Sequence, residues 1–306
     1  MTRFTAQFNK LFLTLIFAAS LGIASGVVVS AQPAAVAQPQ QPKAKKKLPS
    51  GAKGFAQFAG RDASDKLITG GGTRDADPNK PEADVLYTEA SQKGSEHYDK
   101  GEFKEAVEAF KQAVAAKPDQ FLGHYNLGVT YEAMGMFKDA AESYKRAVTL
   151  KAENASDEML AWYNLGNTYA AAGQHKEAVE IYQQIIRREP RYWMVHYNMG
   201  VSYATLNQPK DAISAFNESI RLKPSRDLDL LHYNLGLAYS SDEQYEKAAE
   251  SFKQALMIKP DYAEARYNLG LVYYVLDNQS ALIEQHKILQ AQKPEMASEL
   301  AKLIGK

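Results

Sequence analysis

Cysteine is absent from all 306 residues of the chain. This absence excludes disulfide bonds, thiolate metal sites, cysteine nucleophiles and a cysteine-linked lipid anchor. A surplus of either charge is also missing, because 36 lysines and arginines balance 36 aspartates and glutamates. A balanced charge gives no general attraction to nucleic acid or to an anionic membrane, so we expect no nucleic-acid partner.

Motifs of catalysis are missing as well. The sequence contains no HExxH, GxSxG, Walker loop or dinucleotide fingerprint, and the glycines at 70–72 lack the Gly-Lys-Ser/Thr ending of a phosphate loop. His124, His196 and His232 share one column of a repeat pattern and would lie about 10 Å apart in stacked helix pairs, too far to share a metal. We therefore expect no catalysis, no metal and no cofactor, and we interpret these histidines as packing residues.

One long hydrophobic run is present, from Leu11 to Val29, and it follows the basic residues Arg3 and Lys10. Basic, apolar and then small residues form the order of a secretory signal peptide. Residues 1–31 are therefore predicted to direct export to the periplasm or the exterior. The alternative is an uncleaved N-terminal helix that tethers the protein to a membrane, because the run is close to the length of a membrane span.

Residues 32–83 are predicted to be a flexible linker. The part at 32–50 consists mainly of glutamine, proline, alanine and lysine, which cannot bury enough apolar surface to fold. Its lysines could contact an anionic membrane peripherally, although a solvated basic linker is the simpler interpretation. The glycines at 70–72 are interpreted as a flexible joint, and the stretch before them is a candidate docking peptide for the protein's own groove.

The remainder, residues 84–306, is a repeat array. Glycines recur at intervals of 34 to 38 residues, and columns of alanine, aromatic residues and proline keep the same intervals. The glycines are Gly94, Gly128, Gly166, Gly200, Gly236 and Gly270. Such a period marks a solenoid in which each unit must stack on its neighbours to bury its apolar face.

Each unit is predicted to contain two helices, as residues 159–192 illustrate. Leu165 and Gly166 lie on one face of the first helix, and the small glycine allows the paired helix to approach closely. Gly173 is predicted to end the first helix as a left-handed cap. Pro190 prevents the second helix from continuing.

These columns resemble the tetratricopeptide repeat, whose pattern is W-x2-L-G-x2-Y, then A-x3-F, then P. The resemblance implies an all-α fold, a right-handed α-solenoid of helix-turn-helix repeats with a C-terminal capping helix. The assigned repeats are 87–120, 121–154, 159–192, 193–226, 229–262 and 263–296, followed by the cap at 297–306. Four residues inserted at 155–158 are expected to add about one helical turn or to lengthen a loop.

The resemblance also implies a concave groove along the first helices, where partners bind, faced by the residue two before each glycine. In the second to sixth repeats that residue is an asparagine preceded by a tyrosine. An amide carries both a donor and an acceptor, so a ladder of amides can pair with the backbone of an extended peptide. Alternatively, the asparagines serve only the scaffold. The predicted ladder comprises Asn126, Asn164, Asn198, Asn234 and Asn268 with Tyr125, Tyr163, Tyr197, Tyr233 and Tyr267.

Two further columns are predicted to line the groove, although part of this apolar set could instead pack between repeats. Six residues before the glycine stand Leu122, Leu160, Met194, Leu230 and Glu264, and just after it stand Val129, Asn167, Val201, Leu237 and Leu271. Repeat domains that clamp a terminal carboxylate use lysine and arginine at such positions, and this groove lacks them. The predicted ligand is an extended, fairly apolar peptide or an amphipathic helix of a protein partner.

The sequence therefore predicts a non-enzymatic interaction scaffold or adaptor outside the cytoplasm. The alternative is a structural or assembly protein of the cell envelope that self-associates or binds a wall polymer. Replacing Asn164, Asn198 and Asn234 with alanine is expected to weaken partner capture without loss of helicity.

Overall fold

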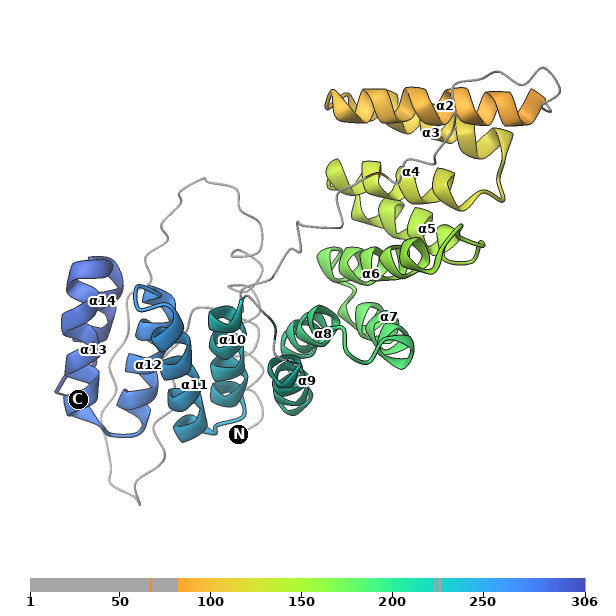
Figure 1. Cartoon of the computed structure of the whole chain (residues 1–306). Helices are drawn as coiled ribbons and strands as arrows, with labels where there is room; N and C mark the ends of the chain where they lie inside the picture. The colour runs from red at the N-terminus through yellow and green to blue at the C-terminus, as the bar shows by residue number, and fades with distance from the viewer. Residues whose placement is uncertain (1–66, 68–81, 223, 225–226, 306) are drawn as a thin grey trace, which may run out of the picture. The chain divides into compact units, whose positions relative to one another are not determined.

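The structure is a computed structural model that describes residue 67, residues 82–222, residue 224 and residues 227–305. The hydrophobic run at 11–29, the linker at 32–50 and the glycines at 70–72 lie outside these residues. In the described part of the chain all thirteen regular elements are α-helices, which confirms the predicted all-α solenoid of helical hairpins (Figure 1). None of these helices is both long and apolar enough to cross a membrane.

The helices alternate between the first and second helix of each repeat. The first helices are α2 (Glu82–Asp99), α4 (Phe121–Ala133), α6 (Ala155–Ala171), α8 (Trp193–Thr205), α10 (Leu228–Ser241) and α12 (Ala263–Val275). The second helices are α3 (Phe103–Ala116), α5 (Phe137–Ala147), α7 (His175–Arg188), α9 (Pro209–Arg221), α11 (Tyr245–Ile258) and α13 (Gln279–Gln292), and α14 (Pro294–Ala301) follows. The helix α2 begins five residues before the predicted start of the first repeat at 87.

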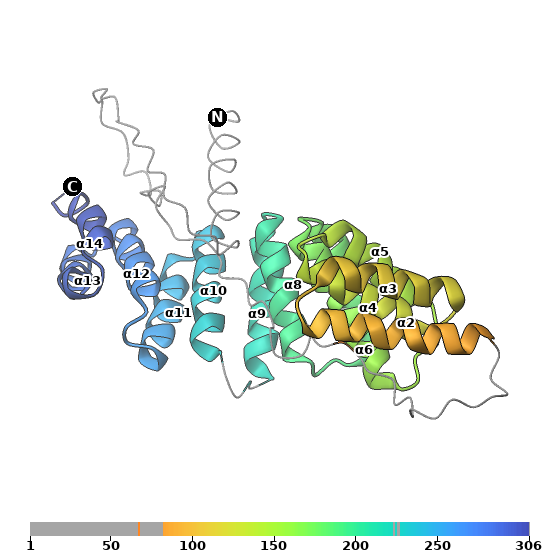
Figure 2. The same ribbon diagram turned by 90° about the horizontal axis from the view of Figure 1, so that it is seen from above.

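The described residues fall into two compact units, divided between Leu206 and Asn207. The N-terminal unit contains Leu67 and helices α2 to α8, and the C-terminal unit contains α9 to α14. Within each unit every helix packs against the next one along the chain, as both views of the ribbon show (Figures 1 and 2). The division falls in the turn between the two helices of the fourth repeat.

In the first, second, third and fifth repeats a glycine of the first helix lies directly under an aromatic ring of the second helix. A Cβ atom built on Gly128 would lie 2.7 Å from the ring of Tyr144, and one on Gly166 would lie 2.6 Å from the ring of Tyr182. Real Cβ atoms do not approach so closely, so only glycine permits this packing. The prediction that these glycines allow close helix approach is confirmed.

The last repeat fills the space over its glycine with a side chain from a different helix. His286 stands where earlier repeats have an aromatic ring, and the space over Gly270 is filled instead by Leu300 of α14, 2.6 Å from a Cβ built there. Leu300 is fully buried. The capping helix therefore supplies a missing core side chain as well as an end to the stack. It begins at Pro294, earlier than the predicted 297, because proline suits the first position of a helix.

The turn between paired helices needs one residue with positive φ. Gly173 has φ 77° and its amide donates to the carbonyl of Ala170, which confirms the predicted left-handed cap. The four inserted residues at 155–158 form an extra turn at the start of α6, so the first of the two alternatives is right. Asn154 caps this turn by accepting from the backbone N–H of Asp157.

Candidate peptide-binding face

The ten residues of the predicted ladder are all buried. The five asparagines are at most 7% exposed and the five tyrosines at most 4% exposed. The structure therefore places the predicted ladder between the first helices of successive repeats, beneath the surface. Direct contact between these side chains and a peptide stays a prediction.

Hydrogen bonds join the ladder from one repeat to the next. Asn164 Nδ2 donates to Tyr125 Oη over 3.1 Å, and Asn198 Nδ2 donates to Tyr163 Oη over 3.2 Å. In the C-terminal unit Asn268 Nδ2 donates to Tyr233 Oη over 3.1 Å. Each of these bonds, which we call Asn–Tyr rungs, links an asparagine to the tyrosine of the preceding repeat. They fix how successive first helices stack.

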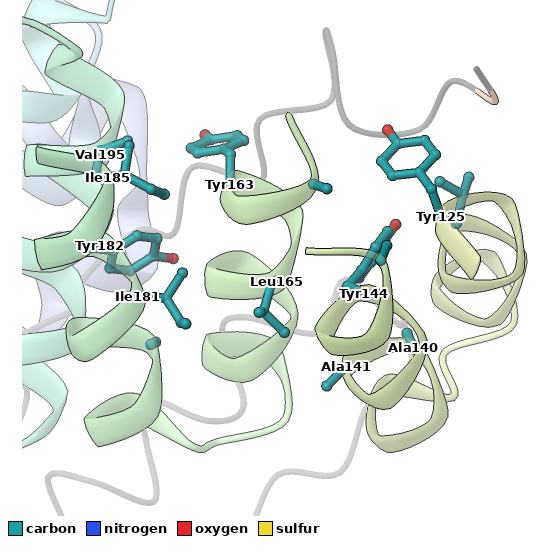
Figure 3. Packing of buried hydrophobic residues seen from close by; sticks show 14 of the residues in the cluster. Tyr125, Ala140, Ala141, Tyr144, Tyr163, Leu165, Ile181, Tyr182, Ile185 and Val195 are labelled. Carbon is teal, nitrogen blue, oxygen red and sulfur yellow. The ribbon is translucent and has the colours of Figure 1, made fainter. Parts of the chain in front are cut away.

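The phenols of the rungs stay neutral over the physiological range. Burial raises the pKa of Tyr125, Tyr163 and Tyr233, and the asparagine bonds oppose this rise only in part. Figure 3 shows Tyr125, Tyr144 and Leu165 gathered in the core of the N-terminal unit, where the rings of Tyr125 and Tyr144 are 5.6 Å apart. A neutral hydroxyl in such a place can accept from an amide and donate to another group.

Two polar residues of the N-terminal unit carry this network toward the surface. Asn167 Oδ1 accepts from Tyr182 Oη over 2.9 Å and from Asn198 Nδ2 over 2.8 Å. Glu132 Oε2 accepts from Tyr144 Oη over 2.9 Å. Asn167 and Glu132 are both partly exposed. Sequence reasoning missed Glu132, and the only available signal was the variable column four residues after the glycine.

The column six residues before the glycine remains accessible. Leu122, Leu160 and Met194 are partly exposed and pack along the core of the N-terminal unit, and Leu230 is partly exposed in the C-terminal unit. The apolar residues just after the glycine behave differently. Val129, Val201, Leu237 and Leu271 are buried, so they belong to the packing between repeats. The accessible part of the predicted face therefore consists of an aliphatic row near the start of the first helices, with Asn167 and Glu132 further along α6 and α4.

In three repeats the residue of the histidine column connects the first helix to the end of the preceding repeat. A 2.9 Å hydrogen bond joins His124 Nε2 and the carbonyl of Pro118, and a 3.0 Å bond joins His196 Nε2 and the carbonyl of Pro190. In the last repeat Arg266 takes this column and donates to the carbonyl of Pro260. The interpretation of His124 and His196 as packing residues is confirmed. Among the described residues no group of histidines and carboxylates could hold a metal ion.

Comparisons with known proteins agree with this geometry. Family models described as tetratricopeptide repeat match residues 121–154 and 163–227, and one described as TPR repeat matches 94–135 and 241–277, so the matches span more than half of the chain. A comparison with curated proteins gives no significant match.

Solved structures give the same result. A crystal structure of MamA protein is 28% identical, with a TM-score of 0.53 over 59% of this chain and 96% of MamA. The structure of YrrB, titled a TPR protein with an unusual peptide-binding site, is 21% identical, with a TM-score of 0.53 over 64% of this chain and 99% of YrrB. The second likeness is one of fold alone.

Proposed function

Since the chain belongs to the tetratricopeptide-repeat family of protein–protein interaction scaffolds, we propose that it is an exported adaptor. Its ligand is an extended apolar peptide or an amphipathic helix of a partner protein, bound along the first helices. The observation that carries this proposal is the partly exposed aliphatic row of Leu122, Leu160 and Met194 in the N-terminal unit.

The row suits a peptide because its side chains repeat at the spacing of the stacked helices. Neighbouring helices pack 8–10 Å apart, a distance spanned by two to three residues of an extended chain. Side chains at this separation in a ligand can then contact successive repeats while its backbone meets Asn167, whose side chain is partly exposed. The likeness to YrrB, a TPR protein described as having an unusual peptide-binding site, is consistent with this use of the fold.

The Asn–Tyr rungs contribute to binding by holding the row in place. They join α4 to α6 and α6 to α8, so the three side chains of the row are fixed relative to one another before a ligand arrives. A face that is already ordered loses less conformational entropy on binding. The proposal therefore assigns ligand contact to Leu160 and Met194, and positioning to Asn164 and Asn198.

The partner can be captured by photo-crosslinking in living cells. A photoreactive phenylalanine analogue at Leu160 or Met194 is expected to trap one protein of defined mass. The same analogue at Met257, which is 74% exposed on the second helix α11, is the matched control and is expected to trap none. Equal yields from all three positions would contradict a specific face along the first helices.

Export is the second part of the proposal, and it rests on the sequence of residues 1–31. Fractionation of cells that express the tagged protein, with the mass of the mature chain, tests it. Recovery outside the cytoplasm with the leader removed is the expected result. A full-length chain in the membrane fraction would favour the tether instead, and recovery from the cytoplasm would contradict export.

A further inference from the structure

Leu67 is the one described residue that precedes α2, and it packs against the repeat array. Its side chain is partly buried and packs against two neighbouring core clusters of the N-terminal unit. One cluster comprises Ala106, Val107, Phe110 and Leu127, and the other includes Phe121, Tyr125 and Val129. A leucine from the predicted linker therefore joins the packing of the first two repeats.

The side chains that share this contact define a platform for Leu67. Tyr98 and Tyr131 pack against both clusters, as Leu67 does, and Met134 packs against the first of them. Tyr98 is one residue from the end of α2, and Met134 is the residue just after α4. One of the two clusters also contains Tyr125, the acceptor of the first Asn–Tyr rung.

This contact lies far from the start of α2. The linker enters α2 at Glu82, whereas Tyr98 lies near the opposite end of the helix, about 24 Å away at the rise of an α-helix. Residues 68–81 can span about 45 Å when extended, so they can reach back over this distance. The contact is therefore a docking contact and does not arise from the local continuation of α2.

The sequence around Leu67 suits a weak and reversible ligand. Leu67 and Ile68 are the only large apolar residues in the stretch RDASDKLIT at 61–69, so one apolar anchor is flanked by polar groups. The glycines at 70–72 follow at once. A ligand tethered on the same chain is present at an effective concentration in the millimolar range.

We propose that the segment at 61–69, anchored by Leu67, is an intramolecular ligand of the platform formed by Tyr98, Leu127, Tyr131 and Met134. A ligand with the same chemistry, an aliphatic side chain in an extended chain, competes with Leu67 for the platform. The competition of the segment with an external partner rests on the proposed function, whereas its own binding to the platform does not.

The test uses the full chain, its Leu67→Asp variant and a fluorescein-labelled synthetic peptide of residues 58–72. An aspartate at position 67 removes the internal competitor, so the peptide is expected to bind this variant about three- to tenfold more tightly than the wild-type chain. A peptide that carries the same substitution is expected not to bind. Fluorescence anisotropy measures each affinity, and circular dichroism verifies that each protein is folded.

Two further variants locate the site. Leu86→Asp is the matched control, because Leu86 is 50% exposed on α2, and it is expected to bind the peptide as the wild-type chain does. Tyr98→Ala in the Leu67→Asp background is expected to weaken peptide binding at least fivefold. Equal affinity of the peptide for wild type and Leu67→Asp, or no binding to either, would overturn the proposal. No external partner takes part, so such a failure would leave the adaptor proposal to its crosslinking test.

Discussion

Repeats 2 and 3 of the N-terminal unit cover their glycines with tyrosines, whereas the C-terminal unit uses phenylalanine and leucine. The ring of Tyr144 or Tyr182 fills the core, and its hydroxyl continues to a partly exposed side chain, Glu132 or Asn167. One residue thus serves both the packing and the polar face.

The C-terminal unit has the packing without this polar extension. Phe252 covers Gly236 and Leu300 covers Gly270, and neither side chain has a hydroxyl to offer. Its Asn–Tyr rung from Asn268 to Tyr233 is nevertheless the same as those of the N-terminal unit. The Asn–Tyr rung therefore belongs to the scaffold of both units. The polar groups that accept from the core tyrosines, Glu132 and Asn167, belong to the N-terminal unit.

Alkaline pH is expected to have the largest effect in both units, and to affect the N-terminal unit more, because six tyrosines with a raised pKa lie there and four lie in the C-terminal unit. Burial raises the pKa of Tyr125, Tyr144, Tyr163 and Tyr182, and raises that of Tyr192 to about 12. These phenols stay protonated in the folded chain, while those of the unfolded chain ionise near pH 10. Their stabilising contribution is therefore complete below pH 10 and is lost as the pH rises above it.

Both tryptophans, Trp162 and Trp193, lie in the N-terminal unit, so their fluorescence reports the unfolding of that unit. Urea unfolding at pH 9 and at pH 11, followed by this fluorescence and by circular dichroism, measures the effect. An unchanged fluorescence midpoint at pH 11 would contradict the burial of these phenols.

Leu165→Ala is expected to destabilise the N-terminal unit by about 2–5 kcal/mol, because Leu165 is 1% exposed and its removal leaves a cavity. Leu86→Ala removes the same group from an exposed position and is expected to change stability by about 0.5 kcal/mol or less. The fluorescence midpoint in urea compares the two. Similar losses from both variants would mean that the core of α6 is not packed as described.

Asn198→Ala and Asn268→Ala are each expected to destabilise the unit that contains the rung. Asn198 donates to both Tyr163 and Asn167, and Asn268 Nδ2 donates to Tyr233. A loss of about 1–2 kcal/mol is expected from each, given the usual value of a buried hydrogen bond. Urea unfolding by circular dichroism measures both, and an unchanged midpoint in either variant would argue against its rung.

Substitutions in the turns between paired helices are expected to have the smallest effect on stability, with opposite signs in the two units. The residue with positive φ is Gly173 in the third repeat but Glu243 in the fifth, where φ is 58°. Glu243→Gly is expected to stabilise the chain by about 0.5–1 kcal/mol, because glycine has no Cβ to clash in this region. Gly173→Ala is expected to destabilise it by about 1 kcal/mol. Thermal unfolding of both variants checks the signs.

Much of the fold could be predicted because the repeat columns report packing directly. The spacing of Gly166 and of the aromatic column predicts a close helix pair, and the structure has it. The role of Leu300 could not be predicted, because it replaces an aromatic residue from another helix and breaks the spacing that reveals the column. When a side chain of another helix takes the place of a repeat column, the sequence period does not reveal it.

The candidate site could be predicted only in part for a related reason. Sequence spacing identifies which residues lie on the first helices, but it does not show how deeply each one is buried. Asn164 and Leu160 are neighbours on α6, yet the first is fully buried and the second is partly exposed. The contact of Leu67 joins residues that are distant in the sequence, and no local pattern encodes such a contact.

The central claim is that the aliphatic row contacts the partner while the rungs position it. Titration calorimetry with the partner captured at Leu160 tests this claim by comparing Leu160→Gln with Asn198→Ala, each measured below its unfolding transition. The account predicts that Leu160→Gln weakens binding at least tenfold with little change in stability, and that Asn198→Ala lowers stability while changing affinity less than threefold. Unchanged affinity in Leu160→Gln together with a large loss in Asn198→Ala would contradict it.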